Sequence, residues 1–247
     1  MQIPSFVLIT GASSGIGRAL AHEYAALGST LFLIARGTYR LERVAAECQM
    51  LGANATAIPA DVTDRAAMAA IINRIESRVP LDLVIANAGG GDVQPPNSAL
   101  TPSSDTIIDT NVVGLLATIH PVIEAMRTRR NGQIAIMSSL AGYLPLKASP
   151  AYSAAKASTR FYGLGLRSYL KPENISVSVI TPGFVATPAT AGAEHPLPFL
   201  ISASTAARKI RLGLQRKRPL IAFPLPLVLL TRLATLLPRR LINMILP

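Results

Sequence analysis

The sequence predicts an α/β fold, a single domain built around a doubly wound parallel sheet with helices on both faces. Three observations support this prediction. Short apolar runs alternate regularly with amphipathic segments, the runs are continuously apolar, and no linker or internal repeat interrupts the series. Continuous apolarity is typical of strands covered on both faces, and strand–helix alternation is typical of parallel sheets. With 247 residues, half of them hydrophobic, the chain can form one large core.

Six apolar runs are interpreted as strands, each long enough to cross a sheet and each without helical periodicity. They are SFVLIT (5–10), TLFLIA (30–35), NATAIPA (54–60), LDLVIA (81–86), GQIAIMS (132–138) and ISVSVIT (175–181). The segments between them carry apolar residues at helical spacing, and the helices are predicted at 15–27, 38–51, 64–78, 104–130 and 151–170. In such sheets ligands bind beyond the carboxyl ends of the strands, so the loops there should carry the function.

The formal net charge of +11 raises the question of a nucleic-acid partner. Nine of the Lys and Arg residues lie in residues 195–247, which contain no acidic residue, and the others are mixed with acids. Few aromatic side chains accompany them, so platforms for stacking bases are not evident. We therefore expect no nucleic-acid partner.

The single cysteine and the N-terminus both bear on the compartment. Cys48 can form no intramolecular disulfide, which fits a reducing compartment, and its helical neighbours predict a buried thiol. The segment IPSFVLIT is short and lacks a basic leader, so we expect no signal peptide. The predicted localisation is cytoplasmic, and no metal-binding set of residues is predicted.

A glycine-rich turn, TGASSGIG, follows the first predicted strand and opens the first helix. Its glycines, Gly11, Gly15 and Gly17, suit a tight turn with positive φ or close backbone approach. The helix that begins there directs free N–H groups and its positive dipole end towards a ligand, which suits a pyrophosphate. The spacing differs from the G-x-G-x-x-G fingerprint of dinucleotide-binding folds, and the lysine of a P-loop is missing.

The end of the second strand, LFLIARG, indicates which dinucleotide would bind. Folds that prefer NAD commonly place an acid here to bind the ribose 2′-hydroxyl, whereas this chain has Ala35 and Arg36. A guanidinium can hold a 2′-phosphate, so NADP(H) is predicted in preference to NAD(H). Arg36 could instead be a solvated loop charge.

Tyr152 and Lys156, in the stretch AYSAAKAS, stand four residues apart in a predicted helix and therefore share one face. A second Tyr-x-x-x-Lys pair, Tyr143 and Lys147, contains Pro145, which prevents a regular helix there. At about 5 Å, with an effective dielectric constant near 20, a lysine charge would stabilise a phenolate by roughly 3 kcal/mol. Burial works against this, but we expect the pKa of Tyr152 to fall towards the working pH.

Other polar residues should lie near this pair. Ser138 and Ser139 end the predicted fifth strand and should point into the ligand crevice. Asn111 interrupts the apolar stripe of the long helix before that strand. Taken alone, Asn111 is better explained as a buried, hydrogen-bonded amide than as a catalytic group.

Together these motifs resemble those of the short-chain dehydrogenase/reductase family. TGASSGIG, DVTD, NAG, NVVG, SSLAG, YSAAK and TPGFVAT occur in that family's order and approximate spacing, over roughly residues 5 to 190. The resemblance implies a Rossmann-type fold and nicotinamide-dependent interconversion of a carbonyl and an alcohol. It also implies that the proton donor is Tyr152 and that Ser139, rather than Ser138, orients the carbonyl. Lys156 would hold the nicotinamide ribose, and Asn111 would support a water-linked proton path.

The glycine turn, the strand ends and the resemblance together indicate residues for the cofactor, and the predicted crevice indicates residues for the substrate. The predicted cofactor contacts are Gly11, Ser13, Ser14, Gly15, Ile16, Gly17, Arg36, Asp61, Val62, Asn87, Ala88, Gly89, Tyr152, Lys156, Pro182, Gly183, Val185 and Thr187. The predicted substrate contacts are Leu140, Tyr143, Leu144 and Phe184, with residues 191–203 as a lid. These side chains carry little charge, so an apolar, lipid-like substrate is expected.

Two departures from the family pattern are visible. The family often has two asparagines before Ala-Gly, whereas this chain has Ala86 and then Asn87, which puts one hydrogen bond between strands in doubt. The chain also lacks the Val-Asp-Gly-Gly ending of tetrameric members. We therefore expect a homodimer and leave tetramer formation open.

The C-terminal segment, 219–247, is hydrophobic and basic and follows the predicted core of residues 3–190. Its apolar stretch from Leu225 to Leu237 is interrupted by Pro226 and Arg232 and is too short to cross a bilayer. It would either complete the core or a subunit interface, or lie on an anionic membrane surface at the inner face of a membrane.

Three functions are consistent with these sequence features. The first is an NADPH-dependent carbonyl reductase of the family named above. The second is a sugar-nucleotide epimerase or dehydratase with the same Tyr-x-x-x-Lys pair, but those chains are generally longer. The third is an NADP-binding, non-catalytic or membrane-associated scaffold, which would not need a proton donor.

Overall fold

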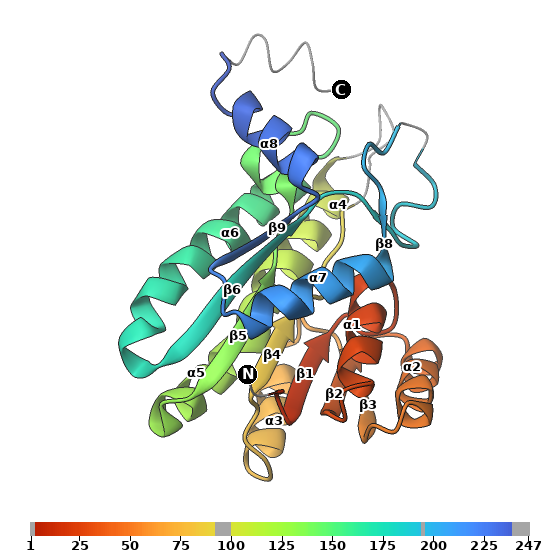
Figure 1. Ribbon diagram of the computed structural model, residues 1–247, viewed down its shortest axis with the longest axis vertical. Coiled ribbons are helices and arrows are strands. Elements are labelled where there is room, and N and C mark those ends of the chain that lie inside the picture. The colour runs from red at the N-terminus through yellow and green to blue at the C-terminus, as the bar shows by residue number, and fades with distance from the viewer. Residues whose placement is uncertain (1–2, 92–99, 194–195, 239–247) are drawn as a thin grey trace.

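The computed structural model describes residues 3–91, 100–193 and 196–238, and within them a central sheet of seven parallel strands (Figure 1). The strands follow the order β3-β2-β1-β4-β5-β6-β9, so the direction of winding changes between β1 and β4. They are β1 (Phe6–Thr10), β2 (Thr30–Ala35), β3 (Ala55–Pro59), β4 (Leu83–Ala86), β5 (Gly132–Met137), β6 (Ile175–Pro182) and β9 (Leu220–Phe223). The predicted doubly wound parallel sheet is confirmed.

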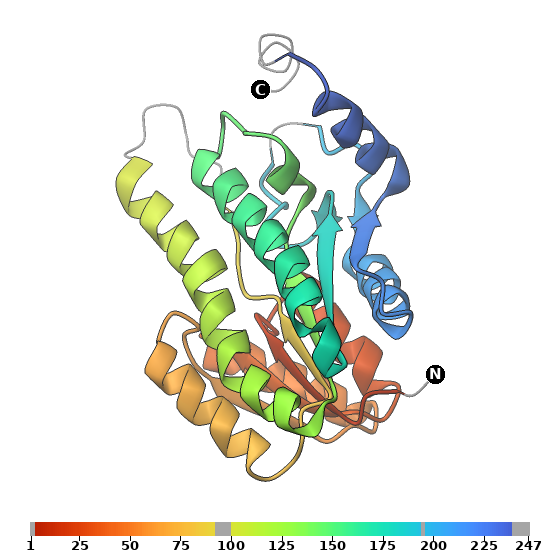
Figure 2. The same ribbon diagram turned by 90° about the vertical axis from the view of Figure 1, so that its left-hand side faces the viewer.

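Helices cover both faces of the sheet, as Figure 2 shows from the side. One layer contains α1 (Gly15–Ala25), α2 (Thr38–Met50) and α7 (Ala203–Gln215). The other contains α3 (Arg65–Glu76), α5 (Gly114–Arg129) and α6 (Pro150–Leu170), with α4 (Leu100–Ile108) ahead of α5. Each layer forms its own buried apolar cluster with one face of the sheet, which is why the strands are apolar on both sides.

The predicted long helix at 104–130 is not one regular helix. A π-helical turn, η1 (Asp109–Val113), separates α4 from α5. By length and composition, the stretch Ser103–Arg129 could cross a membrane. It packs instead against α3, β4 and β5, as a core helix does.

The sheet extends beyond the six predicted strands. The four-residue strand β9 pairs in parallel with β6, and α7 packs against α1 on the same side of the sheet as α2. A small second sheet pairs β7 (Val185–Ala186) with β8 (Ile201–Ser202), within and beside the predicted lid. Residues 194–195 of that lid lie outside the described residues, as do residues 239–247 of the C-terminal segment.

The last described helix, α8 (Leu225–Ala234), follows β9 directly and stands beyond the carboxyl end of the sheet (Figure 1). Residues 220–223 thus complete the core, which is one of the two predictions for the C-terminal segment. The leucines of α8 do not, because most of them are exposed. Cys48 is buried, as predicted, and burial raises the pKa of its thiol to about 11.

Candidate active site

The predicted site residues gather at the carboxyl ends of β1, β4, β5 and β6, where the glycine turn, the β4 loop and the start of α6 meet. The turn between β1 and α1 needs its glycines. Gly11 and Gly15 have φ values of 66° and 53°, a region that side chains with a Cβ rarely adopt. A Cβ on Gly17 would clash with the carbonyl oxygen of Gly11, so α1 can approach β1 this closely only with glycine there.

The N-terminus of α1 is left without a side-chain cap. The N-cap residue Ser14 makes no capping hydrogen bond, whereas Asp64 caps α3 and Ser202 caps α7 through 2.9 Å and 3.1 Å bonds. The first N–H groups of a helix have no partners within it and attract an anion. Thr187 lies against this turn, since a Cβ on Gly15 would come 3.1 Å from the Thr187 methyl carbon. The turn therefore has the features of an anion-binding site.

Asn87 joins the end of β4 to the end of β1. Its Nδ2 donates to the carbonyl oxygens of Thr10 and Gly11 at 3.0 and 3.3 Å. The Thr10 hydroxyl accepts from the backbone N–H groups of Asn87 and Ala88, both at 3.1 Å. The strands are thus linked by several hydrogen bonds although Ala86 stands where the family often has a second asparagine.

Tyr152 lies in the first turns of α6, directly under the loop that follows β4. A Cβ on Gly91 would come 2.7 Å from the tyrosine ring, so this loop can pass over the ring only with glycine there. The phenol is hydrogen-bonded to Ser139. Lys156 Nζ is 5.6 Å from the ring centroid, as the four-residue spacing predicts.

Lys156 is buried, with 3% of its surface exposed, and its Nζ donates to the carbonyl oxygen of Met137 at 3.1 Å. Burial disfavours the charged ammonium and lowers the pKa of Lys156 to about 8. A Cβ on Gly89 would come 3.3 Å from this Nζ, so the β4 loop also approaches Lys156 closely. Tyr152, Lys156 and Gly89 therefore form one compact group.

The expectation that Lys156 lowers the pKa of Tyr152 is wrong for the chain alone. Burial raises the pKa of the Tyr152 phenol above its usual value, and only the hydrogen bond with Ser139 opposes this. The physical reason is that Lys156 is desolvated as well, and its ammonium is held by a backbone carbonyl at the end of β5. Loss of solvent around the phenol therefore outweighs the charge one helical turn away.

Asn111 lies in the π-helical turn η1 rather than in a regular helix. Its Nδ2 donates to the carbonyl oxygens of Gly90 and Ile107, both at 2.8 Å, while its Oδ1 is buried and has no partner among the described residues. A Cβ on Gly89 would clash with this Oδ1. Asn111 is thus only partly satisfied, with a free acceptor on the side of Gly89 and Lys156. Single π turns often occur at functional sites.

The two candidate serines have different partners. Ser138 Oγ is buried and donates to the carbonyl oxygen of Lys156 at 2.7 Å, so it fastens β5 to α6. Ser139 Oγ accepts from the backbone N–H of Ala141 at 3.1 Å and contacts the Tyr152 phenol. The structure therefore brings Ser139, rather than Ser138, together with Tyr152.

The residues predicted for the adenosine end surround the end of β2. Arg36 is exposed and makes no ion pair within the described residues. Asp61 accepts two 2.9 Å bonds from Thr63, which hold its carboxyl pKa below the usual range, with a smaller effect from Arg36. Val62 is buried against Gly114.

Arg40, in the first turn of α2, is near this site and is not among the residues predicted from the sequence. Its guanidinium lies 3.7 Å from the position of a Cβ on Gly37, and no ion pair involves it within the described ranges. A cation at a helix N-terminus is unfavourable without a nearby anion. The signal in the sequence was the repeat of arginine four residues after Arg36.

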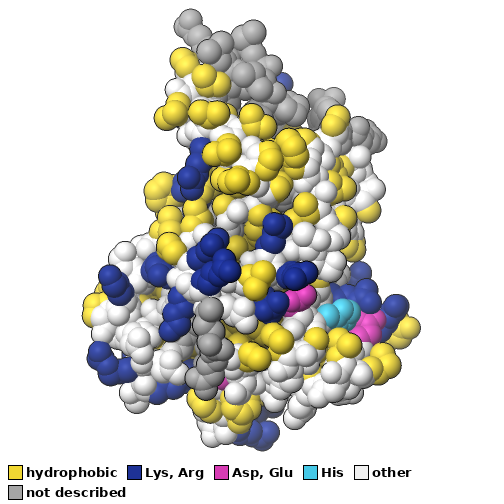
Figure 3. Space-filling model, in the orientation of Figure 1, with side chains coloured by type: hydrophobic (Ala, Val, Ile, Leu, Met, Phe, Trp, Pro, Cys, Tyr) yellow, Lys and Arg dark blue, Asp and Glu magenta, His cyan; other side chains and the backbone are white. Residues whose placement is uncertain are grey.

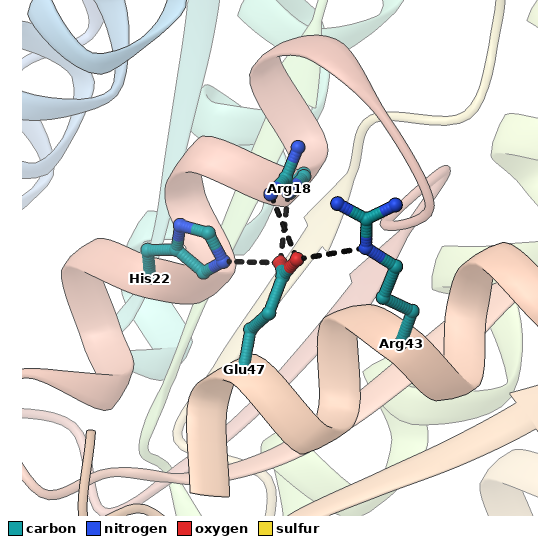
Figure 4. A network of polar contacts seen from close by, with 4 residues as sticks. All are labelled: Arg18, His22, Arg43 and Glu47. Atoms are coloured by element: carbon teal, nitrogen blue, oxygen red, sulfur yellow. Dashed lines mark hydrogen bonds and ion pairs between the residues drawn. The ribbon is translucent and has the colours of Figure 1, made fainter. Parts of the chain in front are cut away.

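A cavity of about 480 Å³ lies outside the glycine turn, between α1, α2 and the segment after β7. Ser13, Ser14, Arg40 and Thr187 line it. Its wall is held by Glu47, which accepts bonds from Arg18, His22 and Arg43 at 2.8 to 3.2 Å (Figure 4). Burial raises the pKa of Glu47, but these bonds outweigh it and keep the pKa below its usual value.

The remaining predicted residues follow β6 and β5. Pro182 ends β6, Gly183 N–H donates to the Phe223 carbonyl oxygen at 2.8 Å, and Val185 is buried in β7. Leu140 lies near Gly183, and both Leu140 and Leu144 are buried. The Tyr143 hydroxyl has no partner within the described parts of the chain, and the Arg160 guanidinium lies 4.0 Å from the centroid of its ring. Their contact with substrate stays a prediction.

Comparison with known proteins agrees with this geometry. The chain is 36% identical over 237 residues to an uncharacterized oxidoreductase of Myxococcus xanthus, covering 96% of this chain and 94% of that one. Among solved structures, a short-chain dehydrogenase from Sphingobium yanoikuyae in complex with NADPH is 29% identical. The match has a TM-score of 0.82 and covers 89% of this chain and 88% of that one.

A second solved structure, the bulky-bulky ketone specific alcohol dehydrogenase from Comamonas testosteroni, is 26% identical with a TM-score of 0.81. That match covers 91% of this chain and 88% of the other. The sequence profile described as short chain dehydrogenase matches residues 5–197, close to the range over which the motifs occur. The chain belongs to the short-chain dehydrogenase family of oxidoreductases.

Proposed function

We propose that the chain is an NADPH-dependent reductase that interconverts a carbonyl and a secondary alcohol on an apolar, lipid-like substrate, with Tyr152 as general acid and base. The observation that carries the proposal is the group formed by Ser139, Tyr152 and Lys156 beside the β4 loop. A non-catalytic scaffold would have no need of a half-buried tyrosine whose phenol contacts a hydroxyl and stands one helical turn from an ammonium.

The residues present fit a nicotinamide dinucleotide. The uncapped N-terminus of α1 suits its pyrophosphate, and the absence of a Cβ on Gly89 lets the β4 loop run close to Lys156 and the unpaired Asn111 Oδ1. Arg36 and Arg40, neither paired in the described structure, suit a 2′-phosphate. When bound, this cofactor supplies or accepts the hydride.

The chain itself supplies the proton and the orientation. Ser139 Oγ accepts from the Ala141 N–H, so its own hydrogen can turn from the Tyr152 phenol to the substrate oxygen. Tyr152 donates its phenolic proton to that oxygen as negative charge develops there, and the Lys156 ammonium stabilises the phenolate that remains. The raised pKa of Tyr152 in the chain alone keeps the phenol protonated, which is the form needed for carbonyl reduction.

A panel of lipophilic ketones, assayed by loss of NADPH absorbance, tests the activity. We expect turnover with NADPH and a kcat/KM at least about tenfold lower with NADH, because a charge-assisted hydrogen bond contributes about 1.5 to 3 kcal/mol. Arg36→Ala should lower kcat/KM with NADPH by about 10- to 100-fold and leave NADH unchanged. Arg78→Ala is the matched control, because Arg78 is exposed just after α3 and away from the predicted cofactor residues. It should leave kcat/KM with both cofactors unchanged.

Two results would contradict the proposal. Equal kcat/KM values with the two cofactors would remove the preference for NADPH. NADPH binding without turnover of any ketone or alcohol would favour the non-catalytic scaffold instead.

A further inference from the structure

The helix α8 is attached to the rest of the molecule on one side only. Val228 is buried with 4% of its surface exposed, and Leu227 lies against Gly183, where an added Cβ would come 2.6 Å from the leucine Cδ2. The helix packs on β9 and on the short 3-10 turn η2 (Leu140–Tyr143) that follows β5. These contacts fix the orientation of α8 relative to the active-site end of the sheet.

The opposite side of α8, which we call the outer face, is apolar and exposed. The exposed fractions of its leucines are 67% for Leu225, 53% for Leu229, 56% for Leu230 and 61% for Leu233, and Leu236 just beyond the helix is 81% exposed. Hydrophobic side chains gather over this part of the surface in Figure 3. Exposed leucines scattered singly need no explanation, but a contiguous set of this kind marks an interaction site.

The arrangement around the helix axis is that of an interfacial helix. At about 100° per residue, the outer leucines fall within a sector of about 140°, and Arg232 lies at one margin of that sector. An arginine at the margin can keep its guanidinium at the level of lipid phosphates while the leucines enter the apolar layer. With ten residues, α8 is too short to cross a bilayer.

The charge around α8 favours an anionic partner. Residues 195–247 contain no acidic residue, and the sequence that follows the described part, RRLINMILP, begins with two arginines. A second copy of the chain, pairing symmetrically through this face, would bring one Arg232 towards the other with no acid from either C-terminal segment between them. An anionic lipid surface meets the same side chains with the opposite charge.

The cations that precede β9 lie elsewhere. Arg216, Lys217 and Arg218 precede β9, whereas α8 follows it, so about 13 Å of strand separates them. Arg211 is paired with Glu23 of α1 at 2.7 Å. These cations therefore lie apart from the outer face, and lipid contact must depend on α8 itself.

We propose that the outer face of α8 docks on the surface of an anionic lipid bilayer, with the helix lying in the plane of the interface. Because α8 begins just after β9 ends, docking directs the carboxyl end of the sheet, beside which Tyr152 lies, towards the bilayer. The proposal concerns binding alone and does not depend on which substrate the site reduces.

Flotation of the full chain with vesicles tests this, using phosphatidylcholine with and without about 30% phosphatidylglycerol. We expect binding to the anionic vesicles that weakens when the ionic strength is raised. Leu229→Ser combined with Leu233→Ser should lower the partition coefficient at least about tenfold, and Arg232→Gln about fivefold on anionic vesicles only. Met50→Ser combined with Leu51→Ser, at exposed positions around the end of α2, should change nothing.

The outcomes separate lipid from other occupants. Loss of binding in the α8 variant, with the α2 variant and the thermal unfolding midpoint unchanged, supports the proposal. No binding of the wild type to either vesicle, or equal loss in both variants, would overturn it. A dimer that dissociates in the α8 variant, with vesicle binding unchanged, would show that a second copy covers the face.

Discussion

The surroundings of Tyr152 and the outer face of α8 lie at the same end of the sheet, but the chain treats their side chains in opposite ways. Around Tyr152, the loop glycines leave no room for a Cβ, and Ser139, Lys156 and the backbone contact one another. On α8, apolar side chains face outwards with nothing of the described chain over them. The close contacts around Tyr152 are those expected of a reaction site, which must hold its groups in fixed positions. The lack of such contacts on the outer face of α8 is expected of a surface that binds an external partner.

The largest difference is expected when Ser138 and Ser139 are replaced by alanine one at a time, because only Ser139 contacts the Tyr152 phenol. Ser139→Ala should lower kcat by about 10²- to 10³-fold, because it removes a donor to the developing oxyanion. It should lower the free energy of unfolding by less than about 1 kcal/mol, because its bond from the Ala141 N–H is only partly buried. Ser138→Ala should lower the free energy of unfolding by about 1 to 2 kcal/mol, because the buried hydrogen bond that joins the end of β5 to the Lys156 carbonyl is lost. Steady-state kinetics and urea unfolding should be measured on both variants. Equal effects on kcat and on stability would contradict a catalytic role for Ser139 and a structural role for Ser138.

The burial of Lys156 can be tested through the pH dependence of stability. Above pH 8 the folded chain releases the Lys156 proton, whereas the unfolded chain keeps it until about pH 10.4, so the unfolded state binds more protons between these values. The free energy of unfolding of the wild type, relative to Lys156→Met, should therefore rise by about 2 to 3 kcal/mol from pH 8 to 10. Cys48 and the tyrosines have raised pKa values in the folded chain, so they make the free energy of unfolding fall as the pH rises. Both proteins contain these groups, so the difference between wild type and Lys156→Met removes their contribution.

The control for this measurement is Lys147→Met, since Lys147 is exposed. Its unfolding free energy should follow that of the wild type at every pH. A flat difference between the wild type and Lys156→Met would mean that the Lys156 ammonium is solvated.

Two glycine variants test whether the turn between β1 and α1 requires the absence of a Cβ. Gly17→Ala should lower the free energy of unfolding by about 1 to 3 kcal/mol, because its Cβ would clash with the Gly11 carbonyl oxygen. Gly165→Ala, in α6 with no atom within 4 Å of the added Cβ, should raise it by about 0.5 to 1 kcal/mol. Thermal unfolding of the two variants should move in opposite directions, and a loss in both would argue against this description of the turn.

The smallest expected effects belong to α8. Val228→Ala should lower the free energy of unfolding by about 1 to 2 kcal/mol, because its side chain is buried against the fold. Leu229→Ala and Leu233→Ala should each change it by less than about 0.5 kcal/mol, because their side chains are exposed. Similar losses from both sides of α8 in urea unfolding would mean that the outer leucines are covered.

Much of this could be predicted from the sequence because the patterns are local. The six predicted strands and the shared face of Tyr152 and Lys156 follow from apolar runs and from helix periodicity. The preference for Ser139 over Ser138 came from the family resemblance, and the contacts agree with it.

What could not be predicted depends on packing between distant segments. The π-helical turn at Asn111 and the added strand β9 leave no periodic signal, since β9 is a four-residue run between prolines. The predicted fall in the pKa of Tyr152 was wrong, because residue spacing gives the distance between Tyr152 and Lys156 but not the loss of solvent around both groups. Whether the α8 leucines are buried likewise depends on which distant parts of the chain pack against the helix, and the sequence pattern does not show this.

The central claim is that Tyr152 donates the proton, and Tyr152→Phe tests it most directly. On the best ketone of the panel, kcat and the dissociation constant for NADPH should be measured on the same preparation. The account predicts that kcat falls by about 10³-fold while the dissociation constant stays within about threefold of the wild type. A kcat within about tenfold of the wild type, with the same cofactor affinity, would contradict it.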